Sequence, residues 1–386
     1  MGGPDPFSPA RLGPVTLRNR FVKAATFEGL TREHVVTDAL VEFHRRVAAG
    51  GVGLTTLAYC AISDDGCGTP NELILTRDSV PGLARLAEAV HAEGAAVSAQ
   101  VGHAGAVAAG TGRQGLSPSR IFSPLAMRRT RAVTPAEIAR IVGDFAAAAR
   151  VVADAGFDAV EVHLGHGYLP SEFLSPRLNR RSDEWGGSLE NRARFPRAVA
   201  TAVREAVGDR LAVVAKFNMA DGVRGGLWLD ESVAVARMLE ADGTVDALEL
   251  TAGSSLQNPM YLFRGEAPVA EMSRAMPKPI RPAFRLAGRA FLREYPFEEA
   301  YLLPYARQFR AALAMPLILL GGVNRLDTVT GALDEGFDFV ALGRALLREP
   351  DLIARWQRGA THESLCVHCN KCMATIYRGT RCVLVE

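Results

Sequence analysis

Short apolar segments alternate with longer segments of helical periodicity along almost the whole chain, and this alternation constrains the fold more than any other feature. The segments predicted as strands are residues 20–25, 51–58, 95–101, 158–163, 212–217, 245–251, 316–320 and 338–342. Helical patterns separate them; one begins at Thr134-Pro135-Ala136-Glu137, which has the spacing of a capping box with proline at the first helical position. Eight strand–helix units of similar length predict an α/β protein with a closed (β/α)8 TIM barrel.

The domain organisation follows from where this pattern ends. Residues 1–360 contain all the predicted strands and would form the barrel, whereas residues 361–386 form a short cysteine-rich tail that we expect to pack on it. Two long insertions, at 104–131 and 252–295, follow predicted strands and would lie at the barrel mouth. A doubly wound open sheet is the competing fold. It usually has a glycine-rich dinucleotide turn after the first strand, and none follows residues 20–25, so the barrel is favoured.

The charge balance bears on the partners. Lys and Arg number 44 against 42 Asp and Glu, so the formal net charge is +2, which argues against a nucleic-acid-binding or membrane-surface protein. The first residues contain no apolar segment typical of a secretory signal, and no later apolar run approaches membrane-spanning length. We therefore expect a cytoplasmic protein that acts on a small molecule, with neither membrane nor nucleic acid as partner, and leave a homo-oligomer open.

Two glycine turns after the last two predicted strands favour a bound phosphate. They are Gly321-Gly322 and Gly343-Arg344. In (β/α)8 barrels a phosphate often lies between these two loops, where backbone N–H groups donate to it, and glycine lets the backbone approach closely. Arg344 would add a positively charged guanidinium, whose planar geometry allows two parallel hydrogen bonds to a phosphate. Glycines also end strands that bind nothing, but two consecutive turns, one of them with an arginine, predict a phosphorylated cofactor.

Two imidazoles and a phenol follow the predicted strand at 158–163. His163 ends the strand, and His166 and Tyr168 lie in the turn after it. Side chains just beyond the carboxyl end of a barrel strand are where a (β/α)8 enzyme places its chemistry. A His-x-x-His pair is also a zinc-ligand pattern, so a metal-dependent barrel lyase or hydrolase that uses His163 and His166 is an alternative, although it needs a third ligand.

Two further polar residues are expected at the same end of the barrel. Lys216 lies in an otherwise apolar strand, where it could stabilise an anionic cofactor or form a buried ion pair with Glu249 on the next strand. Gln100 ends the third predicted strand. It could bond a planar, amide-like ligand edge or, alternatively, the protein backbone.

Four of the six cysteines lie close together in the tail. They are Cys366, Cys369, Cys372 and Cys382, with the spacing C-x₂-C-x₂-C-x₉-C. Thiolates at this spacing suit an iron–sulfur cluster or a tetrahedral zinc ion. Thiols that only close the barrel mouth are the alternative.

Five segments carry a similarity to a known family. Residues 166–195 read HGYLPSEFLSPRLNRRSDEWGGSLENRARF, and the others are LRNRFVKAA (17–25), GGVGL (50–54), SAQVGHAG (98–105) and FVALGRALLREPDL (339–352). With these segments the chain resembles the old yellow enzyme family of FMN-dependent NADH:flavin oxidoreductases, or ene-reductases, over nearly its whole length. The resemblance implies FMN on an eightfold barrel, with NAD(P)H as the reductant.

The resemblance also implies roles for individual residues. Those that would hold the cofactor are Ala24, Ala25, Thr26, Tyr59, Gln100, His163 and Lys216, with Gly322, Gly343 and Arg344 at its phosphate. His163 and His166 match the pair that binds the activating oxygen of an acceptor, and Tyr168 matches the tyrosine that protonates the acceptor carbon. Tyr261 and Arg264, in the insertion after the sixth predicted strand, are expected to reach over the substrate.

Some residues depart from the family pattern. Lys216 stands where the family usually has arginine, and His103-Ala104-Gly105-Ala106 stands where it usually has His-Ala-Gly-Arg. Thr26-Phe27-Glu28 is more similar to the branch of dienoyl-CoA reductases and amine dehydrogenases. That branch carries a four-cysteine [4Fe–4S] site just after the barrel. Because the sequence ends at Glu386, we expect it to lack the flavodoxin-like and dinucleotide domains of that branch.

The function that the resemblance implies is the NAD(P)H-driven reduction of an activated, α,β-unsaturated C=C bond. Hydride would come from flavin N5 and the proton from Tyr168, while His163 and His166 act as an oxyanion hole. An iron–sulfur flavoprotein of the dienoyl-CoA reductase or amine dehydrogenase type is an alternative, beside the metal-dependent lyase or hydrolase. The basic residues at 274–293 form either a solvated helical face or a clamp for an anionic substrate.

Overall fold

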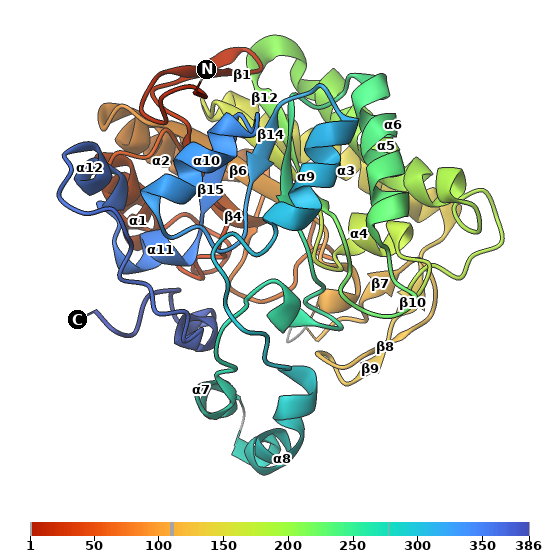
Figure 1. The fold of residues 1–386 in the computed structure, drawn as a ribbon. Helices are drawn as coiled ribbons and strands as arrows, with labels where there is room; N and C mark the ends of the chain where they lie inside the picture. The colour runs from red at the N-terminus through yellow and green to blue at the C-terminus, as the bar shows by residue number, and fades with distance from the viewer. Residues whose placement is uncertain (1, 109–111, 277, 386) are drawn as a thin grey trace.

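The computed structural model describes residues 2–108, 112–276 and 278–385, and its centre is a closed barrel of parallel strands (Figure 1). Eight strands form it: β3 (Phe21–Lys23), β4 (Leu54–Ala61), β6 (Ala96–Gly102), β11 (Ala159–Leu164), β12 (Ala212–Asn218), β13 (Ala247–Thr251), β14 (Leu317–Leu319) and β15 (Phe339–Leu342). The barrel closes because β15 pairs with both β14 and β3, and β3 pairs with β4. The predicted (β/α)8 fold is therefore confirmed.

Helices surround the barrel between and after its strands, and one of them, α11, was not predicted from the sequence. They are α1 (Asp38–Ala49), α2 (Val80–Ala92), α3 (Pro135–Asp154), α5 (Leu189–Val207), α6 (Leu229–Asp242), α9 (Leu303–Ala312), α10 (Leu326–Asp334), α11 (Arg344–Arg348) and α12 (Leu352–Gln357). Helix α3 begins at the predicted capping box, where the Glu137 carboxylate accepts the N–H of Thr134 at 2.9 Å. The predicted second strand, 51–58, is wrong at both ends, because β4 begins at Leu54 and continues to Ala61, so that it includes Tyr59.

An N-terminal hairpin closes one end of the barrel. Its strands, β1 (Ala10–Leu12) and β2 (Val15–Leu17), pair antiparallel, and Leu12 and Leu17 are buried in a cluster with residues of the barrel strands. That cluster includes Val22, Leu54, Ala159, Ala212, Ala247, Ile318, Phe339 and Ala341. Since this end is filled by apolar side chains, the opposite end, where the strands have their carboxyl ends, is left for a site.

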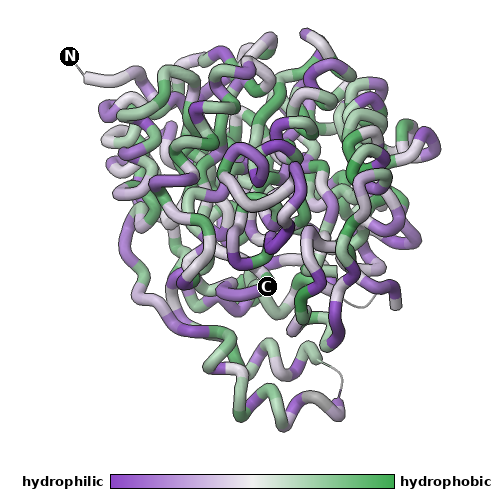
Figure 2. Tube along the Cα trace, turned by 90° about the vertical axis from the view of Figure 1, so that its right-hand side faces the viewer, coloured by the Kyte–Doolittle hydropathy of each residue, from purple (hydrophilic) through white to green (hydrophobic). Residues whose placement is uncertain are grey.

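Both predicted insertions contain regular structure. The first contains a 3-10 turn and short strands: η2 (Gly105–Val107), β7 (Leu116–Ser117), β8 (Phe122–Ser123), β9 (Arg128–Arg129) and the start of β10 (Arg131–Ala132). The second contains η4 (Pro259–Tyr261), α7 (Val269–Ala275) and α8 (Arg281–Phe291). Helices α7 and α8 project from the barrel as an arm in both views, and hydrophilic and hydrophobic residues are mixed along it (Figure 1, Figure 2). Arg285 and Arg289 of α8 are exposed.

The C-terminal tail returns to the mouth of the barrel. Thr380 donates its N–H to the carbonyl of Glu28 at 2.7 Å, and the side-chain amide of Asn370 donates to the carbonyl of Glu266 at 3.0 Å. The division of the chain at residue 360, a homo-oligomeric state and a cytoplasmic location stay predictions. Within the described ranges, no helix has both the length and the apolar character needed to cross a membrane.

Candidate active site

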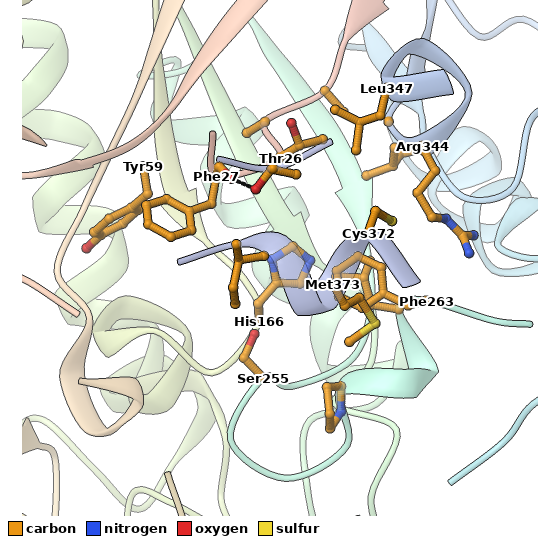
Figure 3. A pocket seen from close by; sticks show the side chains of 18 of the residues that line it. Thr26, Phe27, Tyr59, His166, Ser255, Phe263, Arg344, Leu347, Cys372 and Met373 are labelled. Carbon is orange, nitrogen blue, oxygen red and sulfur yellow. Dashed lines mark hydrogen bonds between the residues drawn. The ribbon is translucent and has the colours of Figure 1, made fainter. Parts of the chain in front are cut away.

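A cavity of about 330 Å³ lies at the carboxyl ends of the barrel strands, within the range of roughly 300–1,000 Å³ that small-molecule sites occupy. Its wall contains all the residues predicted to hold the cofactor or to act on the acceptor: Ala24, Ala25, Thr26, Tyr59, Gln100, His163, His166, Tyr168, Lys216, Gly322, Gly343 and Arg344. Figure 3 shows Thr26, Tyr59 and His166 around this cavity, with Arg344 at its edge. The closed barrel brings these residues together from distant parts of the chain.

His163, His166 and Tyr168 form one group at the end of β11. His163 lies in the strand, and Tyr168 is the residue at which α4 (Leu169–Leu174) begins. His166 and Gly167 have φ values of +59° and +74°, so the chain turns sharply between the strand and the helix. The centroid of the His163 ring lies 4.4 Å from the centroid of the Tyr168 ring and 5.1 Å from that of the His166 ring. The three side chains therefore share one wall of the cavity.

Burial keeps both imidazoles neutral and the phenol protonated. It lowers the pKa of His163 well below its usual range and that of His166 to about 3, and it raises the pKa of Tyr168 above its usual value. His166 Nε2 lies 2.7 Å from the Thr251 hydroxyl, whereas His163 Nδ1 is buried with no hydrogen-bond partner among the described residues. A neutral imidazole carries one N–H, so each histidine can donate one hydrogen bond.

The two histidines do not gather a metal-ligand set around them. In the part of the chain that the structure describes, no group of three or more His, Cys, Asp or Glu side chains is placed to hold a metal ion. His166 Nε2 is already engaged with Thr251. The alternative of a metal-dependent lyase or hydrolase therefore lacks the third ligand that it requires.

Lys216 lies on the cavity wall within a buried ionic network. Its Nζ is 3.2 Å from Glu161 Oε2 and makes a second, closer contact with Glu249, the partner expected from the sequence. The side-chain amide of Gln100 donates a hydrogen bond to Glu161 Oε1 at 2.6 Å. Burial opposes the charge on Lys216, but the two carboxylates outweigh it and raise its pKa. Lys216 is thus both ion-paired and in contact with the cavity.

The glycine turns form a tight cradle at the other end of the cavity. Gly322 has a φ of +77°, and a Cβ placed on it would lie 2.5 Å from ring carbons of Tyr301. Only glycine fits there, because the Tyr301 ring fills the space that a Cβ would need. Gly343 lies on the same wall, and the Arg344 guanidinium donates to the carbonyl of Arg264 at 2.9 Å. This cradle suits the phosphate of a cofactor.

Tyr261 and Arg264 are not part of the cavity wall. The Tyr261 hydroxyl lies 2.7 Å from that of Tyr305, and the Arg264 guanidinium lies 5.5 Å from the centre of the Tyr261 ring. Their neighbours Leu262 and Phe263 line the cavity instead. The tight turn η4 decides which side chains face inward, and position within a loop does not reveal it.

Two parts of the wall were missed by reasoning from the sequence. One consists of Phe27 and Glu72, from the loops after β3 and β4. The other comes from the tail, which was expected to pack on the barrel but not to line the cavity with His368, Cys372, Met373, Ile376, Tyr377 and Thr380. Figure 3 shows Cys372 and Met373 on the same side of the cavity as Phe263. Phe27 could have been found because it follows Thr26, but no spacing in the sequence links the tail to the cavity.

The four tail cysteines line a second, smaller cavity beside the first. Cys372 and Arg344 belong to the walls of both cavities. All four thiols are free, and burial raises the pKa of Cys372 to about 11. Arg348 Nη1 lies 3.9 Å from Cys382 Sγ. The sulfurs are gathered around one space, although the described residues as placed do not form a metal-ligand group.

Comparisons with known proteins agree with this geometry. Residues 5–257 match the model of the NADH:flavin oxidoreductase / NADH oxidase family. The chain is 55% identical over 383 residues to the 4,4'-dithiodibutanoate disulfide reductase of Rhodococcus erythropolis. This alignment covers 99% of the present chain and 95% of the reductase. The chain is 34% identical to the metal reductase of Desulforamulus reducens, over 96% of this chain. A solved structure of the old yellow enzyme homologue from Zymomonas mobilis has a TM-score of 0.73 at 26% identity, covering 95% of this chain and 96% of that one.

These relatives differ in length. The chain covers almost all of the disulfide reductase but only 52% of the metal reductase. The similarity to the first is high over nearly both full lengths, and the family model matches more than half of the chain. Together with the barrel and its cavity, these matches show that the chain belongs to the old yellow enzyme family, the NADH:flavin oxidoreductase / NADH oxidase family, and is an FMN-dependent NAD(P)H oxidoreductase.

Proposed function

We propose that this protein uses NAD(P)H to reduce an activated, α,β-unsaturated C=C bond of a small molecule. The observation that carries the proposal is the grouping of His163, His166 and Tyr168 on one wall of a cavity whose other end is a glycine cradle. Bound FMN would supply the hydride chemistry. The residues of the chain then hold the cofactor, hold an oxygen of the acceptor and provide a proton.

The residues present fit a flavin phosphate. The backbone N–H groups at Gly322 and Gly343, which lie on the cavity wall, would donate to the phosphate, and Arg344 would supply a positive charge. Gln100 and Lys216 would face the flavin ring, where the cation favours negative charge. The remaining contacts would come from Ala24, Ala25, Thr26, Tyr59 and His163.

The acceptor would bind beside the two histidines. His163 and His166 each carry one N–H for its activating oxygen, and His166 would donate from Nδ1 while its Nε2 accepts from the Thr251 hydroxyl. As neutral groups they stabilise the developing negative charge without losing a proton. Tyr168 keeps its proton at neutral pH because burial raises its pKa. It can therefore donate that proton to the acceptor carbon in the step that needs it.

The spectrum of the purified protein tests this proposal. We expect yellow protein whose flavin absorbance is bleached by NADPH or NADH under anaerobic conditions and restored by an α,β-unsaturated ketone. Heat-denatured protein should release FMN, identified by chromatography. Colourless protein that retains no added FMN, or reduced protein that the ketone does not reoxidise, would contradict the proposal.

Disulfide reduction is a second candidate, favoured by the 55% identity to a protein named as a disulfide reductase. One sulfur of the acceptor would take the hydride and leave as a thiol. The S–S bond would break, and the second sulfur would leave as a thiolate that Tyr168 protonates. Both candidates therefore use the same residues. Comparing kcat/KM for a ketone and for 4,4'-dithiodibutanoate with the same reduced enzyme decides between them, since the true acceptor class should be preferred.

We also propose that Cys366, Cys369, Cys372 and Cys382 bind a [4Fe–4S] cluster or zinc, and the support is that they line one small cavity. Anaerobically purified protein is expected to contain iron and acid-labile sulfide in equal amounts, or one zinc ion. Cys369→Ala should lose the metal, whereas Cys60→Ala, a change at a buried cysteine of β4, should keep it. Wild-type protein without iron, sulfide or zinc would show that the thiols only close the barrel mouth.

A further inference from the structure

Glu72 is a buried carboxyl group on the cavity wall to which the proposed reaction gives no role. Its side chain lies in the loop between β4 and β5 (Leu73–Ile74) and is 4% exposed. Its Oε2 accepts the N–H of Gly68 at 2.5 Å, and a Cβ placed on Gly68 would lie 2.9 Å from its Oε1. The loop backbone therefore packs directly against the carboxyl and holds it in place. Among the described residues that line the cavity, Glu72 is the only carboxylic acid.

Three tyrosines line the same cavity as this carboxyl and feel its charge. Tyr59 comes from β4, Tyr168 from the turn before α4, and Tyr377 from the tail. The rings of Tyr59 and Tyr168 lie 5.1 Å apart. Burial, and after it the charge of Glu72, raises the pKa of Tyr59 and Tyr168. The pKa of Tyr377 is raised in the same direction, although this residue is 46% exposed. One carboxyl thus acts electrostatically on the predicted proton donor and on both of its phenolic neighbours.

Among the described residues, two thiols and an imidazole also lie near Glu72. Burial and nearby carboxylates raise the pKa of Cys60 and Cys67 above the usual value, so both stay protonated. His34 Nδ1 lies 2.7 Å from the backbone carbonyl oxygen of Glu72. Burial raises the pKa of Glu72 itself to about 7, against the hydrogen bond from Gly68. Near neutral pH, Glu72 can therefore exchange a proton while the phenols and thiols around it hold theirs.

We propose that Glu72 returns a proton to Tyr168 after each turnover. This role rests on the proposed function, in which Tyr168 gives its O–H proton to the acceptor and becomes a phenolate. The protonated carboxyl of Glu72 passes its proton across the cavity to that phenolate and becomes a carboxylate. The carboxylate then takes a proton from solvent, so that one proton enters the site for each proton that leaves with the product.

Glu72→Gln tests the proposal, because glutamine keeps the size and an acceptor for Gly68 but carries no exchangeable acid. Pre-reduced variant should be reoxidised at the wild-type rate in a single turnover, since Tyr168 already holds its proton. In the steady state, kcat should fall by roughly ten- to a hundredfold. Glu172→Gln is the matched control: Glu172 is equally buried, on α4, but does not line the cavity.

The pH profile gives a readout that a purely structural role would not change. Glu72 carries its proton below its pKa, so wild-type kcat should fall as the pH rises through about 7, and this fall should be absent from Glu72→Gln. Infrared difference titration should show a protonated-carboxyl band that the wild type loses over the same range. Glu172→Gln should retain both features, because it leaves Glu72 and its hydrogen bond from Gly68 unchanged.

The outcomes separate this inference from the function on which it rests. If Glu72→Gln turns over at the wild-type rate with the wild-type pH profile while Tyr168→Phe is slow, the role of Glu72 is wrong and the proposed function stands. If Tyr168→Phe reduces the acceptor at the wild-type rate, the proposed function itself fails. Should Glu72→Gln not fold, wild-type protein without a carboxyl transition near neutral pH overturns the inference.

Discussion

Replacing Tyr168 with phenylalanine is expected to slow acceptor reduction by roughly 100- to 10,000-fold, the usual contribution of a positioned general acid. Phenylalanine keeps the ring that lies 5.1 Å from Tyr59 and 4.4 Å from His163, so the cavity wall should persist. Only the hydroxyl is lost. Reduction of the flavin by NAD(P)H should keep its wild-type rate, because that half-reaction does not draw on the Tyr168 proton. Stopped-flow absorbance measures the two half-reactions separately.

A matched control is Tyr305→Phe, which removes a tyrosine hydroxyl that bonds to Tyr261 outside the cavity wall. Both half-reactions of this variant should remain at the wild-type rate. An equal loss of both half-reactions in Tyr168→Phe would indicate a damaged cavity rather than a missing proton. Acceptor reduction at the wild-type rate would remove Tyr168 from its proposed role.

Replacing Lys216 with methionine is expected to lower the free energy of unfolding by about 3–5 kcal/mol, as when one partner of a buried ion pair is removed. Lys216 is 1% exposed, and without it Glu161 and Glu249 share a buried site with no cation between them. The carboxyls can respond by binding protons, and burial already raises the pKa of Glu249. Urea unfolding of the variant and the wild type measures the loss.

The loss should depend on pH in a defined direction. Carboxyls whose pKa is higher in the folded protein than in the unfolded chain bind more protons when folded, so stability falls as the pH rises above the unfolded value. The free energy of unfolding of the methionine variant should therefore fall further below that of the wild type at pH 8 than at pH 6. Lys216→Arg, which keeps the charge, is the control, and adding Glu249→Gln to the methionine variant should recover part of the loss. A methionine variant as stable as the wild type at pH 8 would show that the two carboxyls do not depend on Lys216.

Much of the fold was predictable because it is encoded locally. Each barrel strand is short and buried on both sides, and each helix covers it with one apolar face, so both leave a periodic pattern in the sequence. A closed parallel barrel then places the carboxyl ends of all strands at one mouth. For this reason His163, Lys216 and Gly343 could be expected to meet before any coordinates were known. The identity of the ligand, FMN, was predicted from the resemblance to a family and not from the periodicity of the sequence.

Local periodicity was thus enough to predict the barrel, the end at which the site lies and the strand residues that face it. The three-dimensional arrangement was needed to show that tail residues line the cavity, that Glu72 lines it together with Tyr168, and that Tyr261 bonds to Tyr305 outside its wall. The physical reason is the range of the interactions. Periodicity reports how a segment packs on its immediate neighbours, whereas the wall of a cavity depends on the backbone turns of irregular loops and on which distant segments come to lie beside them.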